Sequence, residues 1–121
     1  MADVALGPKS KVFRFGELTA TTGPTGVIGR RVLRGTVETG EAVEIHESMQ
    51  PGGVTPMPQH VIAHTELLCV REGTLEFLHD GKVERAEAGS VLFVAKGTMH
   101  QMRNGGDGPV SYFVVEIGGD V

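Results

Sequence analysis

The sequence predicts a single all-β domain, folded as a barrel or a sandwich. About nine or ten short strand-like runs recur at intervals of roughly eight to twelve residues, which is the spacing typical of these folds. Eighteen glycines are spread over the 121 residues, so tight turns are available along the whole chain. No stretch has the apolar period of a helix, and the length suits one domain with a core of its own.

The expected strands are runs of apolar and β-branched residues separated by turn residues. They are expected at residues 11–15, 31–37, 42–49, 66–71, 74–78, 82–86, 90–95, 99–103 and 110–117. Residues 1–10 are expected to be loosely ordered or arm-like, and residues 17–29, which are rich in Thr and Gly, to form a loop. Asp80 and Gly81 form the strongest hairpin signal in the chain, because Asp-Gly stands there between two strand-like runs.

The composition argues against several classes of partner. The net charge is −4 at pH 7 and no basic patch stands out, so a nucleic acid is not expected as a partner. No apolar run approaches the length of about eighteen residues that a membrane span needs, and no signal peptide is recognised, so a cytoplasmic protein is expected. Cys69 is the only cysteine and is expected to be a small buried apolar residue.

Three residues form the strongest candidate for a metal site, namely His60, Glu66 and His100. Imidazole nitrogen and carboxylate oxygen are donors that suit iron, zinc or manganese. Six residues of extended chain span about 20 Å, so His60 and Glu66 can share an ion only if the chain folds back between Ile62 and Thr65. His100 is expected at the start of a third strand, directly after a turn at residues 96–97.

The spacing of these residues resembles two motifs of the cupin superfamily, in particular its small single-domain members. The motif G-x5-P-x-G-x2-H-x3-N is matched by Gly89, Gly97, His100 and Asn104, with Ala95 in place of proline. The motif G-x5-H-x-H-x3-4-E-x6-G is matched by His60, Glu66 and Gly73, with Gly53 one residue further from His60 and with Ile62 at the second histidine. The resemblance covers residues 41–117 and implies a double-stranded β-helix, or jelly-roll barrel, with a site in its mouth.

The resemblance also implies a ligand set. Cupins usually hold a metal with three histidines and one glutamate, and this chain keeps three of the four as His60, Glu66 and His100. Two imidazoles and a carboxylate form a viable set for one divalent transition metal, here iron, manganese, zinc or nickel. His64 or Gln59 could replace the lost imidazole, while Ile62 and Met102 are expected to line the pocket.

Several functions are compatible with such a site. The first is a metal-dependent enzyme acting on a small organic molecule, of the dioxygenase, isomerase, decarboxylase or lyase type, with Glu66 or His64 as a general base if either is not a ligand. The second is a non-catalytic protein that binds a small ligand or a metal. A third is a metal-free isomerase that uses a histidine and Tyr112, the only tyrosine. By resemblance, a homodimer is expected.

Overall fold

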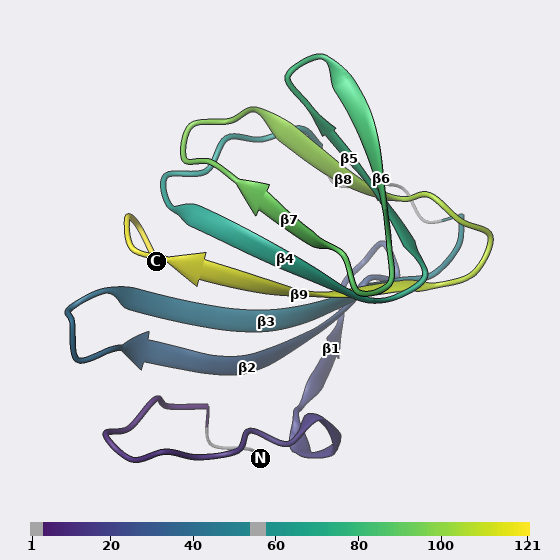
Figure 1. The fold of residues 1–121 in the computed structure, drawn as a ribbon. Helices are drawn as coiled ribbons and strands as arrows, with labels where there is room; N and C mark the ends of the chain where they lie inside the picture. The colour runs from purple at the N-terminus through teal and green to yellow at the C-terminus, as the bar shows by residue number, and fades with distance from the viewer. Residues whose placement is uncertain (1–3, 54–57) are drawn as a thin grey trace.

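The computed structural model describes residues 4–53 and 58–121, and these residues form nine strands and one short 3₁₀ turn (Figure 1). The turn is η1 (Phe15–Glu17), and the strands are β1 (Ala20–Thr22), β2 (Ile28–Thr36), β3 (Ala42–Gln50), β4 (Thr65–Glu72), β5 (Thr74–His79), β6 (Lys82–Glu87), β7 (Val91–Val94), β8 (His100–Asn104) and β9 (Val110–Ile117). The all-β prediction is therefore confirmed. None of the described residues belongs to a helix long and apolar enough to cross a membrane.

The strands form two antiparallel sheets. The larger sheet has the order β1-β2-β3-β9-β4-β7, and the smaller sheet has the order β6-β5-β8. In Figure 1 the smaller sheet stands over the β4 and β7 end of the larger one, while β1 and β2 lie toward the N-terminal segment. Because β9 pairs with both β3 and β4, it joins the two halves of the larger sheet.

The core lies between the two sheets. Alternate residues of each strand point inward, as the period of two in a β-strand requires. The buried apolar residues are Ile62, Leu68, Val70, Leu75, Phe77, Ala86, Leu92, Val94, Met102, Val110, Tyr112 and Val114. At the end of β4 nearest residue 65 this apolar lining gives way to polar residues, and the candidate site begins there.

The N-terminal segment differs from its prediction. Residues 11–15 do not form a strand, and β1 lies inside the range expected to be a loop. The Phe15 ring instead packs edge-on against Phe113 of β9, with centroids 6.4 Å apart. The guanidinium carbons of Arg30 and Arg71 lie over the Phe15 ring, 4.9 and 4.5 Å from its centroid. These ring contacts hold the segment on the outer face of the large sheet, so it does not need to pair as an edge strand.

Two glycine positions define the connections around the small sheet. Asp80 and Gly81 both have positive φ, at 50° and 76°, which is the conformation that an Asp-Gly hairpin turn between paired strands requires. Gly73, between β4 and β5, has φ of 76°, and a β-carbon there would lie 2.3 Å from the carbonyl oxygen of Pro109. Gly73 therefore lets the chain turn while it touches the backbone that leads into β9.

Candidate metal and ligand site

A cavity of about 300 Å³ opens between the sheets, with the predicted residues His60, Glu66, His100 and Met102 among those that line it. The long strand β3 contributes His46, Ser48 and Gln50 to the wall, because these residues alternate along its inner face. Strand β9 contributes Tyr112, Val114 and Glu116. The cavity thus has an apolar floor and a polar rim, which is the usual composition of a small-molecule site.

The rings of His60 and His100 lie side by side on one wall, with centroids 4.4 Å apart. Their residues are joined by a pair of backbone hydrogen bonds of 3.0 Å, so residue 60 adds to the small sheet beside β8. The Nδ1 atom of His60 donates to the carbonyl of Pro58 at 3.2 Å, and that of His100 donates to the carbonyl of Thr98 at 2.9 Å. These bonds leave each Nε2 with a lone pair, which is how metal-binding histidines are commonly oriented.

Glu66 stands at the start of β4, on the large sheet, and is only 8% exposed. The chain between His60 and Glu66 therefore turns from one sheet to the other, and it does so after Ile62, whose carbonyl accepts a hydrogen bond from Gly97 at 3.0 Å. The expected return of the chain is present, but His60 and Glu66 lie on facing sheets and not on adjacent strands of one sheet. His100 begins β8 after the turn at residues 96–97, as predicted.

His64 lies beside Glu66 and is surrounded by carboxylates. Its Nε2 is 2.8 Å from Oε2 of Glu66 and 3.4 Å from Oε2 of Glu116, and its Nδ1 is 2.6 Å from Oδ1 of Asp120. The His64 side chain is 11% exposed. Partial burial acts to lower the pKa of His64, but the hydrogen bonds to Asp120 and Glu66 and the charge of Glu116 outweigh it and raise that pKa above its ordinary value.

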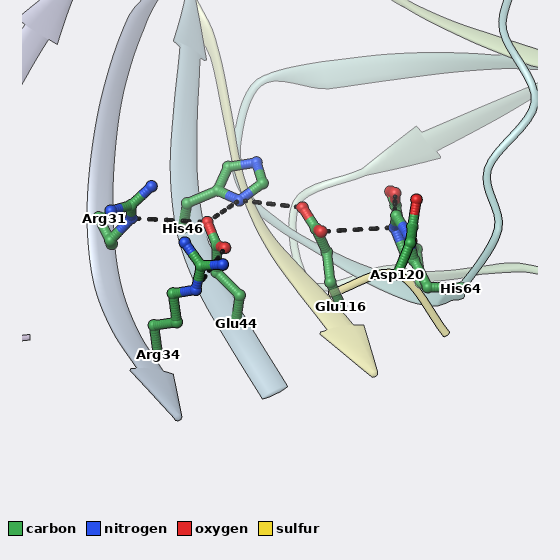
Figure 2. A network of polar contacts seen from close by, with 8 residues as sticks. Arg31, Arg34, Glu44, His46, His64, Glu116 and Asp120 are labelled. Atoms are coloured by element: carbon green, nitrogen blue, oxygen red, sulfur yellow. Dashed lines mark hydrogen bonds and ion pairs between the residues drawn. The ribbon is translucent and has the colours of Figure 1, made fainter. Parts of the chain in front are cut away.

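A row of polar contacts continues from His64 across the large sheet (Figure 2). Oε1 of Glu116 is 3.5 Å from Nδ1 of His46, and the same nitrogen is 3.9 Å from Glu44. Arg31 and Arg34 of β2 approach the two oxygens of Glu44 at 3.6 and 3.8 Å. The row thus runs from two arginines through alternating carboxylates and imidazoles to Asp120.

The cause of this row is the strand register. Glu116 of β9 stands directly opposite Glu44 of β3 on one side and opposite Glu66 of β4 on the other. Three glutamates therefore share one line across three neighbouring strands, an arrangement that is unfavourable unless cations separate the charges. Burial, the largest cause, and the nearby Glu66 and Glu44 carboxylates raise the pKa of Glu116, although His46 and His64 oppose that shift.

The other predicted residues lie in different places. Ile62 is buried in the apolar core and is not among the residues that line the cavity. Gln59 is exposed and lines a separate depression beside the β5–β6 hairpin, together with His79 and Met99. Asn104, which matches the motif, stabilises the turn before β9, since its side chain bonds the N–H of Gly106 and the carbonyls of Gly108 and Gln50 at 2.9, 2.8 and 3.1 Å.

The donor atoms around Glu66 suit a divalent transition metal in type, because they are imidazole nitrogens and carboxylate oxygens. Among the described residues, two groups have donor atoms that all lie within 4.8 Å of one another. One group is His64, Glu66 and Glu116, and the other is Glu44, His46 and Glu116. His60 and His100 line the same cavity but belong to neither group.

The prediction from sequence did not include His46, Glu44 or Glu116 in the site. A signal for the first two was present, because Glu44, His46, Ser48 and Gln50 form a polar stripe at every second residue of one strand. Nothing comparable marks Glu116, which follows an apolar run and reaches the site only through the pairing of β9. Tyr112, by contrast, was considered, and its hydroxyl receives a hydrogen bond from Gln50 at 2.8 Å on the cavity wall.

Comparison with known families agrees with this architecture. A family model described as "Cupin domain" matches residues 45–116, which is more than half of the chain. The protein is a cupin. The resemblance inferred from the two motifs is therefore confirmed, and so is the predicted jelly-roll fold. No curated protein matches this cupin in sequence.

Solved structures resemble this cupin in fold. An RmlC-like cupin from Shewanella frigidimarina has a TM-score of 0.72 at 16% identity, with 92% of this chain and 94% of that chain covered. The polyketide cyclase RemF from Streptomyces resistomycificus has a TM-score of 0.71 at 15% identity, with 93% and 87% covered. The DMSP lyase DddQ from Ruegeria pomeroyi has a TM-score of 0.58 at 26% identity, with 65% and 39% covered. The first two likenesses concern the fold alone.

Proposed function

We propose that this cupin is a metal-dependent enzyme that acts on a small organic molecule in its barrel mouth. The ion would be a divalent transition metal, held by the imidazoles of His60 and His100 and by the carboxylate of Glu66. The observation that carries the proposal is the orientation of the two histidines, whose Nδ1 atoms donate to backbone carbonyls and whose Nε2 atoms are bonded by no described residue. Both rings line the cavity that Glu66 also lines.

The residues of the site would have different roles in the reaction. When bound, the ion supplies Lewis-acid chemistry, which polarises a carbonyl or lowers the pKa of a bound water. Leu68 and Val114 exclude water from the floor, while the hydroxyl of Tyr112 and the amide of Gln50 offer hydrogen bonds to polar atoms of a ligand. While its Nε2 binds no cation, His64, in contact with Glu66, would accept or return a proton at that nitrogen.

The cavity has room and access for a small organic molecule. A wider groove of about 820 Å³ beside β1 and β2 shares Val27 and His46 with the cavity and also includes Arg31. Two proteins of similar fold have enzymatic names, a polyketide cyclase and a DMSP lyase. They support enzymatic chemistry on small molecules in general, and of the reaction types compatible with the site, a lyase or isomerase reaction needs no second substrate.

A second candidate function is non-catalytic binding of a small ligand. The observation in its favour is Ile62, which lies in the apolar core at the position where cupins commonly have a further histidine. A cavity with fewer metal donors would still bind an organic molecule through its apolar floor. Oxygen uptake and turnover of a panel of small substrates by the metal-loaded protein would separate the two candidates, because a binder gives no product.

The first prediction concerns metal content. Protein purified without chelators and then loaded with iron, manganese, nickel or zinc is expected to retain a stoichiometric ion after desalting, as measured by inductively coupled plasma mass spectrometry. His60→Ala and His100→Ala are each expected to lower that content, because each removes one imidazole donor.

His79→Ala is the matched control, since His79 lies on a neighbouring strand but does not line the cavity. It is expected to leave the metal content unchanged. Wild-type protein that holds no ion after loading with any of the four metals would contradict the proposal.

A further inference from the structure

The group formed by His64, Glu66 and Glu116 has the dimensions of a cation site. Donor atoms that lie about 2.0–2.2 Å from one ion stand roughly 3.0–3.5 Å from one another in tetrahedral or octahedral geometry. The Nε2 atom of His64 is 2.8 Å from Oε2 of Glu66 and 3.4 Å from Oε2 of Glu116, and all three atoms lie within 4.8 Å of each other. A small outward shift of these side chains would admit an ion between them.

His64 is also oriented for such a role. Oδ1 of Asp120 is 2.6 Å from Nδ1, so that nitrogen carries a proton, and Nε2 is directed at the two glutamates. A carboxylate that binds the far nitrogen of an imidazole is the commonest support of metal-ligating histidines. Asp120 is therefore a positioning residue, while His64 is the donor.

The charge of the row points to a cation at one of its ends. Glu44 is compensated by Arg31 and Arg34, but among the described residues no lysine or arginine forms an ion pair with Glu66 or Glu116. These two carboxylates stand directly opposite each other on β4 and β9 and are largely removed from water. Within residues 4–53 and 58–121, the cationic or titratable groups that contact them are the imidazoles of His64 and His46, so a divalent cation would balance the excess negative charge.

An independent feature of the cavity also indicates a ligand. His100 is 1% exposed and lines the wall of the same cavity as Glu66 and Glu116, and no described residue hydrogen-bonds its Nε2. Because no fully buried side-chain nitrogen or oxygen of the described residues lacks a partner, Nε2 of His100 is accessible from the cavity, where an occupant can bond it.

We propose that His64, Glu66 and Glu116 form a second divalent-cation site at the rim of the cavity, separate from the donors His60 and His100. Glu66 is common to both sites and can serve them through its two oxygens. Two carboxylates and one imidazole are donors suited to zinc, manganese, iron or cobalt. Glu116 of β9 thereby acts as a metal ligand, with Oε2 toward His64 and Oε1 toward His46.

Titration with Co²⁺ of protein freed of metal tests this site, because the visible absorption of the ion reports binding and coordination. Wild-type protein and the double variant His60→Ala with His100→Ala are both expected to bind Co²⁺ here. Made in that double variant, His64→Gln and Glu116→Gln are each expected to abolish the absorption. Asp120→Asn is expected to weaken the affinity by about 10–100-fold, as the loss of such a supporting partner commonly does.

His79→Gln is the matched control, because His79 also lies between two carboxylates, Asp80 and Glu84, but belongs to no group of three donors among the described residues. It is expected to bind Co²⁺ as the wild type does. Circular dichroism of each variant shows whether it has folded. Wild-type protein can also be tested without any substitution, by measuring the ¹⁵N chemical shifts of its imidazole nitrogens. Zn²⁺ is expected to change the shift of Nε2 of His64.

The outcomes separate this inference from the proposed function. If His64→Gln and Glu116→Gln, made in the double variant, leave its Co²⁺ binding unchanged, or if Zn²⁺ leaves the ¹⁵N shift of Nε2 of His64 unchanged, the second site does not exist. The proposed function is then tested only by the metal content of the His60 and His100 variants. If the double variant retains all bound cation, the second site is supported and the ligand roles of His60 and His100 are wrong. A wild-type protein that binds no cation overturns both.

Discussion

His79 shows how neighbouring residues decide what an imidazole does. Like His64, it lies between two carboxylates, with Nδ1 at 2.8 Å from Asp80 and Nε2 at 2.5 Å from Glu84. Its ring stacks on Phe77 with centroids 4.2 Å apart. Because His79 lies in the β5–β6 hairpin and does not line the cavity between the sheets, these contacts stabilise a turn.

We predict that the pKa of His79 lies above the ordinary value of about 6.5 for a free imidazole. Hydrogen bonds to Asp80 and Glu84 are the largest causes of the increase, and partial desolvation opposes them. Because the folded-state pKa is raised, the stabilisation from His79 is fully present below the unfolded pKa and is lost as the pH rises through the folded pKa. An NMR titration of the imidazole proton measures it.

Glu84→Gln is expected to bring the pKa of His79 down, because it removes one negative charge next to Nε2. A pKa of His79 at or below that of a free histidine in the wild type would contradict the hydrogen bonds of this hairpin.

At this scale the sequence predicted residues whose roles depend on local spacing. The position of His100 after its turn and the turn-stabilising role of Asn104 both follow from short offsets. The line of Glu44, Glu116 and Glu66 could not be predicted, because it requires the register of β9 against two strands far away in the chain. The side chain of Ile62 illustrates the same limit, since spacing alone does not show that it faces the core.

The elements connect through glycines that have different surroundings. Gly73 and Gly81 have the same φ of 76°, but a β-carbon at Gly73 would lie 2.3 Å from the carbonyl oxygen of Pro109 and 2.9 Å from the α-carbon of Val110. At Gly81 no heavy atom lies within 4 Å of that position. An alanine at either position would therefore have the cost of an unfavourable backbone conformation, but only at Gly73 would it also have the cost of close packing.

We predict that Gly81→Ala lowers the free energy of unfolding by about 1–2 kcal/mol, the usual cost of a β-carbon in a left-handed conformation. Gly73→Ala is expected to cost clearly more, because the backbone before β9 must also move. Urea denaturation of the two variants beside the wild type measures the difference. Equal decreases in the free energy of unfolding would show that the backbone at Pro109 shifts without an energetic penalty.

Most strands were predictable because apolar and polar residues alternate along each run and turn residues flank it, and that pattern is local. Strand β1, which lies in the range expected to be a loop, is one exception, and the segment around Phe15 is another, because the alternation of residues 11–15 suggested an edge strand. Its structure depends on Arg30, Arg71 and Phe113, which come from three other strands. Such long-range ring contacts leave no signal in the segment itself.

At the scale of the whole molecule, the outer face of the large sheet has a continuous apolar area. Val91 and Phe93 of β7 are 63% and 61% exposed. They stand opposite Cys69 and Leu67 of β4, which in turn stand opposite Phe113 and Val115 of β9. These four partners are half-buried, so the exposed part of the area lies on β7, and exposed apolar surface of this kind commonly marks a protein–protein interface.

We predict that this face joins two copies of the chain, so that the protein sediments as a homodimer in analytical ultracentrifugation. Phe93→Ser is expected to shift the equilibrium toward monomer, because it removes an exposed aromatic ring from the edge strand β7, where the area is most exposed. Val83→Ser, on the small sheet at 50% exposure, is the control and is expected to leave the mass unchanged. A monomeric wild type would contradict the prediction.

The position of β9 between β3 and β4 has a consequence for the order in which the protein is made. Glu116, Tyr112 and Val114 all come from this strand, yet their partners are synthesised tens of residues earlier. Until residues 110–117 have left the ribosome, β3 and β4 have no common neighbour and the cavity has no floor. A site that includes these residues is therefore expected to form only after residues 110–117 have been translated.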